Sequence, residues 1–224
     1  MQERGRPMDF SSKECIRFGW EAFKSRPWFY IGACLLVMLA YLVAGLVTGG
    51  IDYAVTGDLE KQSLPGGLVS FVFSTLVSMG MTAFYLDAHD HPETAGYSSL
   101  WHPKPFWSFL IANLAVAIVV AVGFVLLIVP GIIALLMFMF SSFVVIDREK
   151  GPIESMAVSK LITKGHRWPL LGFVLLLLLI NIAGLLALVV GLFVSIPVST
   201  LAFTHAYRVL GGAAPATRDA SLSV

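Results

Sequence analysis

Residues 106–146 read FWSFLIANLAVAIVVAVGFVLLIVPGIIALLMFMFSSFVVI, which is 41 residues without a charged side chain. As one straight α-helix this stretch would be about 60 Å long, roughly twice the thickness of the hydrocarbon core of a bilayer. The chain must therefore fold back within it. Pro130-Gly131 is the expected turn, because proline lacks a backbone donor and glycine tolerates turn dihedral angles. The stretch predicts two membrane-spanning helices, at about residues 106–129 and 131–146.

A second uncharged stretch, residues 169–207, has 39 residues and predicts the same arrangement, with a break near Gly191 or Pro197. Two apolar runs earlier in the chain are each long enough for one span. We therefore expect an all-α polytopic membrane helix bundle of six transmembrane helices, arranged as three hairpins. The expected spans are residues 28–48, 67–86, 106–129, 131–146, 169–190 and 192–208, in a membrane domain (28–210) that follows a cytoplasmic segment with an amphipathic helix (1–27) and precedes a disordered cytoplasmic tail (211–224).

The overall composition agrees with this architecture. Hydrophobic residues make up 57% of the 224-residue chain and charged residues only 13%, whereas soluble domains have roughly 25% charged residues. This composition excludes a soluble monomer. The net charge of +1 provides no basic field for nucleic acid, so no nucleic-acid partner is expected.

The distribution of basic residues predicts the orientation. With six spans, 14 of the 15 Lys and Arg residues fall on one side of the membrane, and only Lys61 falls on the other. Basic residues concentrate in cytoplasmic loops. We therefore expect a multi-pass protein of the cell (cytoplasmic or inner) membrane with both termini in the cytoplasm.

Three predicted hairpins each begin with basic residues next to a tryptophan. At these positions an indole favours the membrane interface and basic side chains reach anionic headgroups. The pattern indicates either an internal triplication or the ordinary composition of a cytoplasmic interface. The expected lipid-interface residues are Lys24, Arg26, Trp28, Lys104, Trp107, Lys160, Lys164, Arg167 and Trp168.

Two amphipathic segments, residues 12–24 and 152–164, precede the first and third hairpins. In the second, Ile153, Ala157, Val158, Leu161 and Ile162 share one half of a helix, and Ser155, Ser159, Lys160 and Thr163 share the other. Such helices can lie in the membrane plane with the apolar face down. They can equally be cytoplasmic extensions that pack on a neighbouring helix, although the interfacial arrangement is the favoured interpretation.

Apart from Arg208, the last residue of the sixth, the predicted spans contain no Asp, Glu, Lys or Arg, which argues against an ion-coupled transporter. Their polar residues serve either as interhelical hydrogen-bonding groups, the favoured interpretation, or as the lining of a polar substrate path. The positions concerned are Asn113, Asn181, Ser195 and His205.

Asp87, His89 and His91 lie close together in the sequence, with His102 further along, and carry ligand types that suit a transition metal. The two histidines are spaced i, i+2 in a proline-containing loop, so they do not share a helical face. A solvated loop without metal is therefore the expected arrangement. The sequence has no phosphate-binding glycine loop, Gly-x-Ser-x-Gly, CxxC or HExxH motif, so we expect no catalytic residues and no cofactor.

The second half of the chain resembles a family of uncharacterised prokaryotic six-helix membrane proteins related to the membrane domain attached to some glycerophosphodiester phosphodiesterases. The resemblance lies in LIVPGII (127–133), FVVID (143–147), GPIESMAVSKLITKGHRW (151–168), Ile196-Pro197 and Ala206-Tyr207-Arg208. It implies a polytopic membrane protein but no activity, because the chain has no room for a phosphodiesterase domain.

These observations favour a non-enzymatic integral membrane protein that organises or assists a membrane complex or its lipid surroundings. Its expected partners are the anionic headgroups of the cytoplasmic leaflet, other membrane proteins or further copies of itself. The alternatives are a transporter or channel for a small or amphipathic solute and, more remotely, a membrane-embedded metal-dependent enzyme.

Overall fold

A computed structural model describes residues 10–58, 60–101, 105–187 and 191–213. Every regular element in this part of the chain is a helix. The elements are α1 (Ser12–Ser25), α2 (Pro27–Thr56), α3 (Leu64–Asp90), the 3-10 helix η1 (Tyr97–Leu100), α4 (Phe106–Leu126), α5 (Ile128–Phe138), α6 (Ser141–Arg148), α7 (Pro152–Ile162), α8 (Arg167–Leu186) and α9 (Leu192–Ala213).

Five helical stretches in the described residues are long and apolar enough to cross a membrane: α2, α3, α4, the stretch Ile128–Arg148 that comprises α5 and α6, and α8. A multi-pass membrane protein is thus supported by length and composition. The predicted sixth span corresponds to α9, which is not among the five. Its sequence includes Ser195, Ser199, Thr200, Thr204 and His205, and these polar side chains lower its hydropathy.

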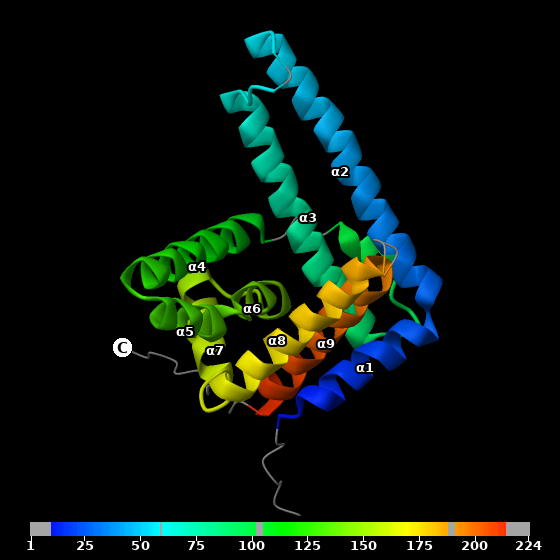
Figure 1. The fold of residues 1–224 in the computed structure, drawn as a ribbon, viewed down its shortest axis with the longest axis vertical. Helices are drawn as coiled ribbons and strands as arrows, with labels where there is room; N and C mark the ends of the chain where they lie inside the picture. The colour runs from blue at the N-terminus through cyan, green and yellow to red at the C-terminus, as the bar shows by residue number, and fades with distance from the viewer. Residues whose placement is uncertain (1–9, 59, 102–104, 188–190, 214–224) are drawn as a thin grey trace, which may run out of the picture.

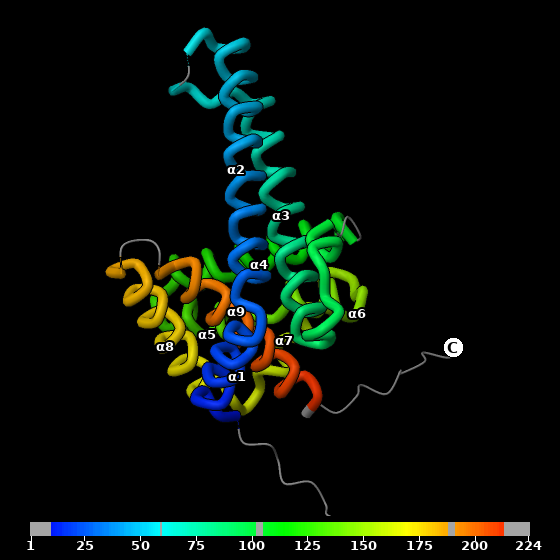
Figure 2. Tube along the Cα trace, turned by 90° about the vertical axis from the view of Figure 1, so that its right-hand side faces the viewer, coloured from blue at the N-terminus to red at the C-terminus, as the bar shows by residue number. Residues whose placement is uncertain are grey.

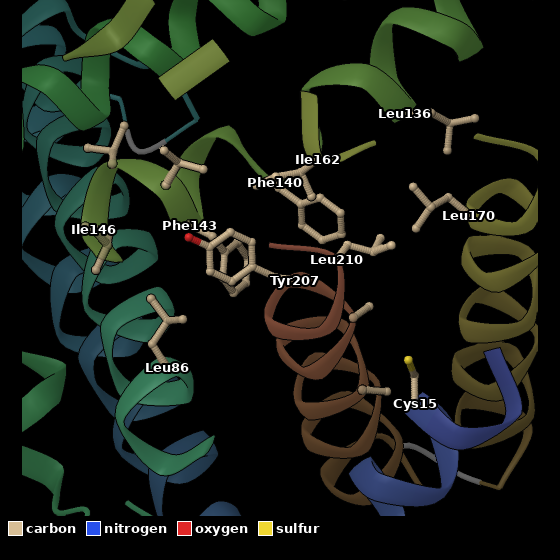
Figure 3. Packing of buried hydrophobic residues seen from close by; sticks show 14 of the residues in the cluster. Cys15, Leu86, Leu136, Phe140, Phe143, Ile146, Ile162, Leu170, Tyr207 and Leu210 are labelled. Atoms are coloured by element: carbon tan, nitrogen blue, oxygen red, sulfur yellow. The ribbon is translucent and has the colours of Figure 1, made fainter. Parts of the chain in front are cut away.

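The helices pair along the chain, α2 with α3, α4 with α5 and α8 with α9. The α2–α3 pair projects well beyond the remaining helices (Figures 1 and 2). The main core takes buried side chains from α1 and from each of α3 to α9. In it, Phe140, which precedes α6, and Phe143 of α6 lie beside Tyr207 of α9 (Figure 3). Helices α3, α6 and α9 therefore meet in this core.

The first uncharged stretch turns at Leu127, so the prediction of a turn at Pro130-Gly131 is wrong. Leu127 is extended (φ −166°, ψ 153°), and α5 begins at the next residue. Pro130 lies in the first turn of α5, where a backbone N–H would have no helical partner and its loss costs nothing. Gly131 instead lets α4 and α5 approach each other closely. A Cβ atom added to Gly123 would lie only 2.9 Å from the Cα atom of Gly131.

The second uncharged stretch breaks before α9, on the Gly191 side. Pro197 lies inside α9, so it does not end the helix. A Cβ on Gly184 would collide with Ser195 Oγ, which shows how closely α8 and α9 approach. Residues 188–190, the predicted end of the fifth span, lie outside the described residues.

The predicted span 131–146 is interrupted, because α5 ends at Phe138 and α6 begins at Ser141. A broken helix frees backbone groups that need other partners where water is scarce. Ser159 of α7 supplies them: its Oγ accepts from the Phe140 N–H (3.2 Å) and donates to the Met137 carbonyl (2.9 Å). Thr163 Oγ1 lies 3.4 Å from the same carbonyl.

This contact corrects the predicted orientation of residues 152–164. Ser155, Ser159 and Thr163 are fully buried against the protein, although the sequence placed them on the half facing away from the membrane. Ile153 and Leu161 of the apolar half are exposed, whereas Ile162 is buried. The three hydroxyl side chains of the polar half face inward because they allow close packing and Ser159 satisfies the broken backbone, whereas Lys160 of the same half is exposed.

We expect Ser159→Ala to lower the free energy of unfolding by about 2 kcal/mol, because a buried N–H left without a partner costs about 1–3 kcal/mol. Denaturant unfolding of the purified protein in detergent measures this change. Ser78→Ala is the control, since Ser78 is exposed on α3, and such changes stay within about 0.5 kcal/mol. Equal effects of the two substitutions would show that Ser159 does not support the break.

Helix α1 packs directly on α9 (Figure 1), which is the second of the two arrangements considered for residues 12–24. Gly19 makes this possible, since a Cβ there would collide with the Val198 carbonyl oxygen and lie 2.9 Å from the Ala202 nitrogen. Cys15 and Phe23 are buried on the same face, and Trp20 remains 44% exposed. The helix starts as its sequence indicates, with Ser11 Oγ accepting from the Glu14 N–H at 3.4 Å.

Candidate functional site

Three charged side chains meet where α3 and α6 end, beside the C-terminal part of α9. The Arg208 guanidinium of α9 binds Asp90 of α3, with Nε donating to Oδ1 at 3.1 Å. It also binds Asp147 of α6, with Nη2 2.7 Å from Oδ1. Tyr207 donates its hydroxyl hydrogen to Asp147 Oδ2 at 2.7 Å. We call Asp90, Asp147 and Arg208 the charged hub.

The hub is held by apolar packing around it. Tyr207 is buried against Phe140 and Phe143, and the side chains of Asp147 and Arg208 are only 16% and 28% exposed. Ion pairs that are partly removed from water interact more strongly than fully exposed ones. The hub therefore fastens three helices that are far apart in the sequence.

Two histidines extend the hub toward α1. His89 Nε2 lies 3.1 Å from His205 Nδ1, and His89 Nδ1 lies 3.0 Å from Asp90 Oδ1. The Phe18 ring of α1 stacks on His205 with ring centroids 4.1 Å apart. His205, expected within a span as packing or path, thus connects α1, α3 and α9.

The candidate metal ligands take different partners. His91 Nδ1 lies 3.2 Å from Asp87 Oδ1, whereas His89 contacts Asp90 and His205. Asp87 also accepts a hydrogen bond from Ser99 Oγ. Among the described residues, no group of three or more His, Cys, Asp or Glu side chains is close enough to hold a metal ion; His102 lies outside them.

The three tryptophans of the predicted interface are strongly exposed: Trp28 by 82%, Trp107 by 71% and Trp168 by 82%. Lys24, Lys160 and Lys164 are exposed too, and Arg167 is half-buried. Exposed indoles at the starts of α2, α4 and α8 and the ammonium groups that precede α2 and α8 are available to headgroups. Lys104 lies outside the described residues.

Arg26 differs from the other predicted interface residues. Its Nη1 donates to the carbonyl oxygens of Pro92 (3.0 Å) and Ala95 (3.3 Å), and its guanidinium lies over the Phe29 ring at 4.1 Å. Arg26 therefore holds the loop after α3 against the start of α2. This contact joins residues more than 60 positions apart, so the local pattern of charge and tryptophan could not reveal it.

The intramembrane asparagines link neighbouring helices. Asn181 Nδ2 donates to Ser199 Oγ at 2.9 Å, and Asn181 Oδ1 accepts from Ser195 Oγ at 3.1 Å, which joins α8 to α9. Asn113 Oδ1 accepts from Ser142 Oγ at 2.8 Å, which joins α4 to α6. Of Asn113, Asn181, Ser195 and His205, Asn181 alone lines the cavity of about 530 Å³ between α3, α8 and α9.

Sequence reasoning missed Asp90, Asp147 and Arg208 as site residues. A signal was present, because each lies at or just after the end of an apolar run and one of them has the opposite charge. Their pairing across 61 and 118 positions required the fold, since i, i+4 spacing reports only local pairs.

No family model, curated protein or solved structure matches this chain. The chemistry of the site therefore has to be judged from its own geometry. Its charged groups bind one another, and the arrangement is suited to fastening helices together.

Proposed function

We propose that this chain is a non-enzymatic membrane protein of six spans in three hairpins, with both termini in the cytoplasm, which organises or assists a membrane complex or its lipid surroundings. The observation that carries this proposal is the charged hub. It joins Asp90 and Asp147, at the ends of α3 and α6, to Arg208 in the C-terminal part of α9. These are the three helices that would return to the cytoplasmic side. A common fastening at one side leaves the apolar outer faces of the hairpins for lipid or protein partners.

Surface chemistry supports a role in the membrane. Large apolar side chains of α2 remain exposed along its length, including Met38 (57%), Leu42 (54%) and Leu46 (71%). In a bilayer such surface contacts acyl chains or another membrane protein. The resemblance to the six-helix family is part of the same proposal and adds no activity to it.

A transporter or channel is the second candidate, because the cavity of about 530 Å³ has Asn181, Ser199 and Thr200 in its wall. However, Asn181 and Ser199 bind each other. Ser195 also binds Asn181 but does not line the cavity, and Asn113 and His205 contact other helices. Separate interhelical contacts favour a structural role for these residues over a continuous polar path.

Topology is tested with a reporter enzyme that is active only outside the cytoplasm. We expect activity when it is fused after Gly57 and none when it is fused after Gly151, because the basic side chains stay cytoplasmic. The two fusions control for each other. Activity after Gly151, or a silent but stably expressed fusion after Gly57, would contradict the six-span orientation.

The function itself is tested by extracting the full chain into native nanodiscs and identifying the proteins and lipids retained with it. A reproducible set of partners that is lost in Arg208→Ala and kept in Arg17→Ala would support the organising role. Uptake of a solute by proteoliposomes that disappears in Asn181→Ala would instead establish the transporter.

A further inference from the structure

We propose that the cytoplasmic half of α3 binds a phospholipid whose headgroup ends in a primary ammonium, such as phosphatidylethanolamine. This inference rests on the proposed membrane role and names one lipid that the protein selects. It derives from two cavities that lie on one face of α3 and share a wall residue, Trp101.

The first cavity, which we call the tail groove, has a volume of about 350 Å³. It lies between α2, α3 and the η1 segment, which Figure 1 shows in green against the lower part of the α2–α3 pair. Its walls are apolar, with Leu36 and Ala40 from α2 and Leu76 and Val77 from α3. No charged side chain lines it, so an acyl chain suits it chemically.

The second cavity, the head pocket, has a volume of about 470 Å³ and lies nearer the end of α3. Asp87, Asp90 and Asp147 line it together with Arg208 and His91. Three carboxylates face one guanidinium, so the pocket is net acidic even when His91 is protonated. It therefore favours a cationic group over a phosphate-terminated or glycerol-terminated headgroup.

The two cavities are held in line by the segment that separates them. The η1 segment crosses α3 so closely at Gly80 that a Cβ there would collide with the Leu100 carbonyl oxygen. Tyr97 fixes the other side of the segment by donating to the Phe29 carbonyl at 3.2 Å. Leu76, Gly80, Ala83 and Asp87 follow one another at helical spacing, so one face of α3 runs from the tail groove into the head pocket.

The ligand has to be amphipathic to use both cavities. Trp101, which lines both and is 75% exposed, offers an indole face to a cation and an apolar wall to the adjoining chain. Asp87 is the carboxylate whose charge the hub does not neutralise, because it binds His91 and Ser99 whereas Asp90 and Asp147 are bound by Arg208. A primary ammonium has three N–H donors for carboxylate oxygens; a quaternary ammonium has none.

The test uses the full-length protein incubated with vesicles of equal parts phosphatidylethanolamine, phosphatidylcholine and phosphatidylglycerol with identical acyl chains. The protein is then re-extracted, and the retained lipids are quantified by mass spectrometry. We expect phosphatidylethanolamine to be retained about tenfold over either of the others. Equal retention of phosphatidylglycerol, or of phosphatidylcholine, would overturn the assignment.

Two variants separate the head pocket from the tail groove. Asp87→Asn keeps an oxygen acceptor for Ser99 but removes the negative charge, so it should abolish the preference for phosphatidylethanolamine. Ala40→Leu fills the tail groove and should lower retention of that lipid about tenfold. Ala54→Leu, on an exposed position of the same helix, should leave retention unchanged. Thermal unfolding verifies that each variant is folded.

A preference that survives in Asp87→Asn would also overturn the proposal. Loss of lipid selectivity with correct reporter activity after Gly57 and Gly151 would reject this site alone. Incorrect reporter activity would reject the six-span orientation on which the site rests.

Discussion

Arg208→Ala should lower the free energy of unfolding by about 3 kcal/mol. Removing one partner of a buried ion pair costs about 3–5 kcal/mol, and the partial exposure of the hub places the expected value at the lower end. Without the guanidinium, Asp90 and Asp147 lose their shared counter-charge. Unfolding of the purified protein in detergent, followed by circular dichroism, measures the difference.

Two further substitutions show whether the stability depends on the positive charge of Arg208 or on the planar guanidinium that binds two carboxylates at once. Arg208→Lys keeps the charge but cannot bridge both carboxylates in the same way, so we expect an intermediate loss of about 1–2 kcal/mol. Arg17→Ala is the control, because the Arg17–Glu21 pair is mostly exposed, and such pairs contribute about 0–1 kcal/mol. If Arg208→Ala is no more harmful than Arg17→Ala, the hub does not fasten the three helices.

Gly19→Ala should detach α1 from α9 and expose Cys15. The added methyl group would meet the Val198 carbonyl oxygen and the Ala202 nitrogen, and backbone atoms of a packed helix cannot rotate away as a side chain can. Cys15 reports the change because burial, aided by the negative charge of Glu14, raises the pKa of its thiol from 9.0 to about 11. Undocking should return the pKa to its ordinary value.

The thiolate is the reactive form of cysteine. A fall in the pKa of Cys15 from about 11 to 9.0 therefore raises its rate of alkylation at pH 8 about a hundredfold. The rate is measured with a water-soluble maleimide in a Cys34→Ala background. Gly172→Ala is the matched control, because no atom outside its own helix lies within 4 Å of the added Cβ. A Cys15 rate in Gly19→Ala equal to that of the control would refute close packing as the reason for this glycine.

The long uncharged stretches predicted the helices well because their signal is local. A run of apolar residues needs only its own backbone hydrogen bonds to form a helix in a bilayer. The precise ends were less predictable. Pro130 fits a turn and the first turn of a helix equally well, and only the packing of Gly123 against Gly131 shows which one is used.

The candidate site was less accessible to sequence reasoning. Asn113 and Asn181 were recognised as polar groups among apolar ones, and each binds a side chain of another helix. Their partners could not be named, because interhelical register is a property of packing. Arg26 was assigned to the lipid interface by composition, yet its partners are carbonyl oxygens beyond α3.

By itself, therefore, the sequence determined the helical class and the placement of most apolar helices, since hydropathy acts residue by residue. The tertiary structure alone decided which way α7 faces and how Asp90, Asp147 and Arg208 combine. Both depend on groups distant in the chain: the broken backbone at Phe140 requires a donor and an acceptor from Ser159, and a charge at the end of one helix is stabilised only when folding brings opposite charges to it.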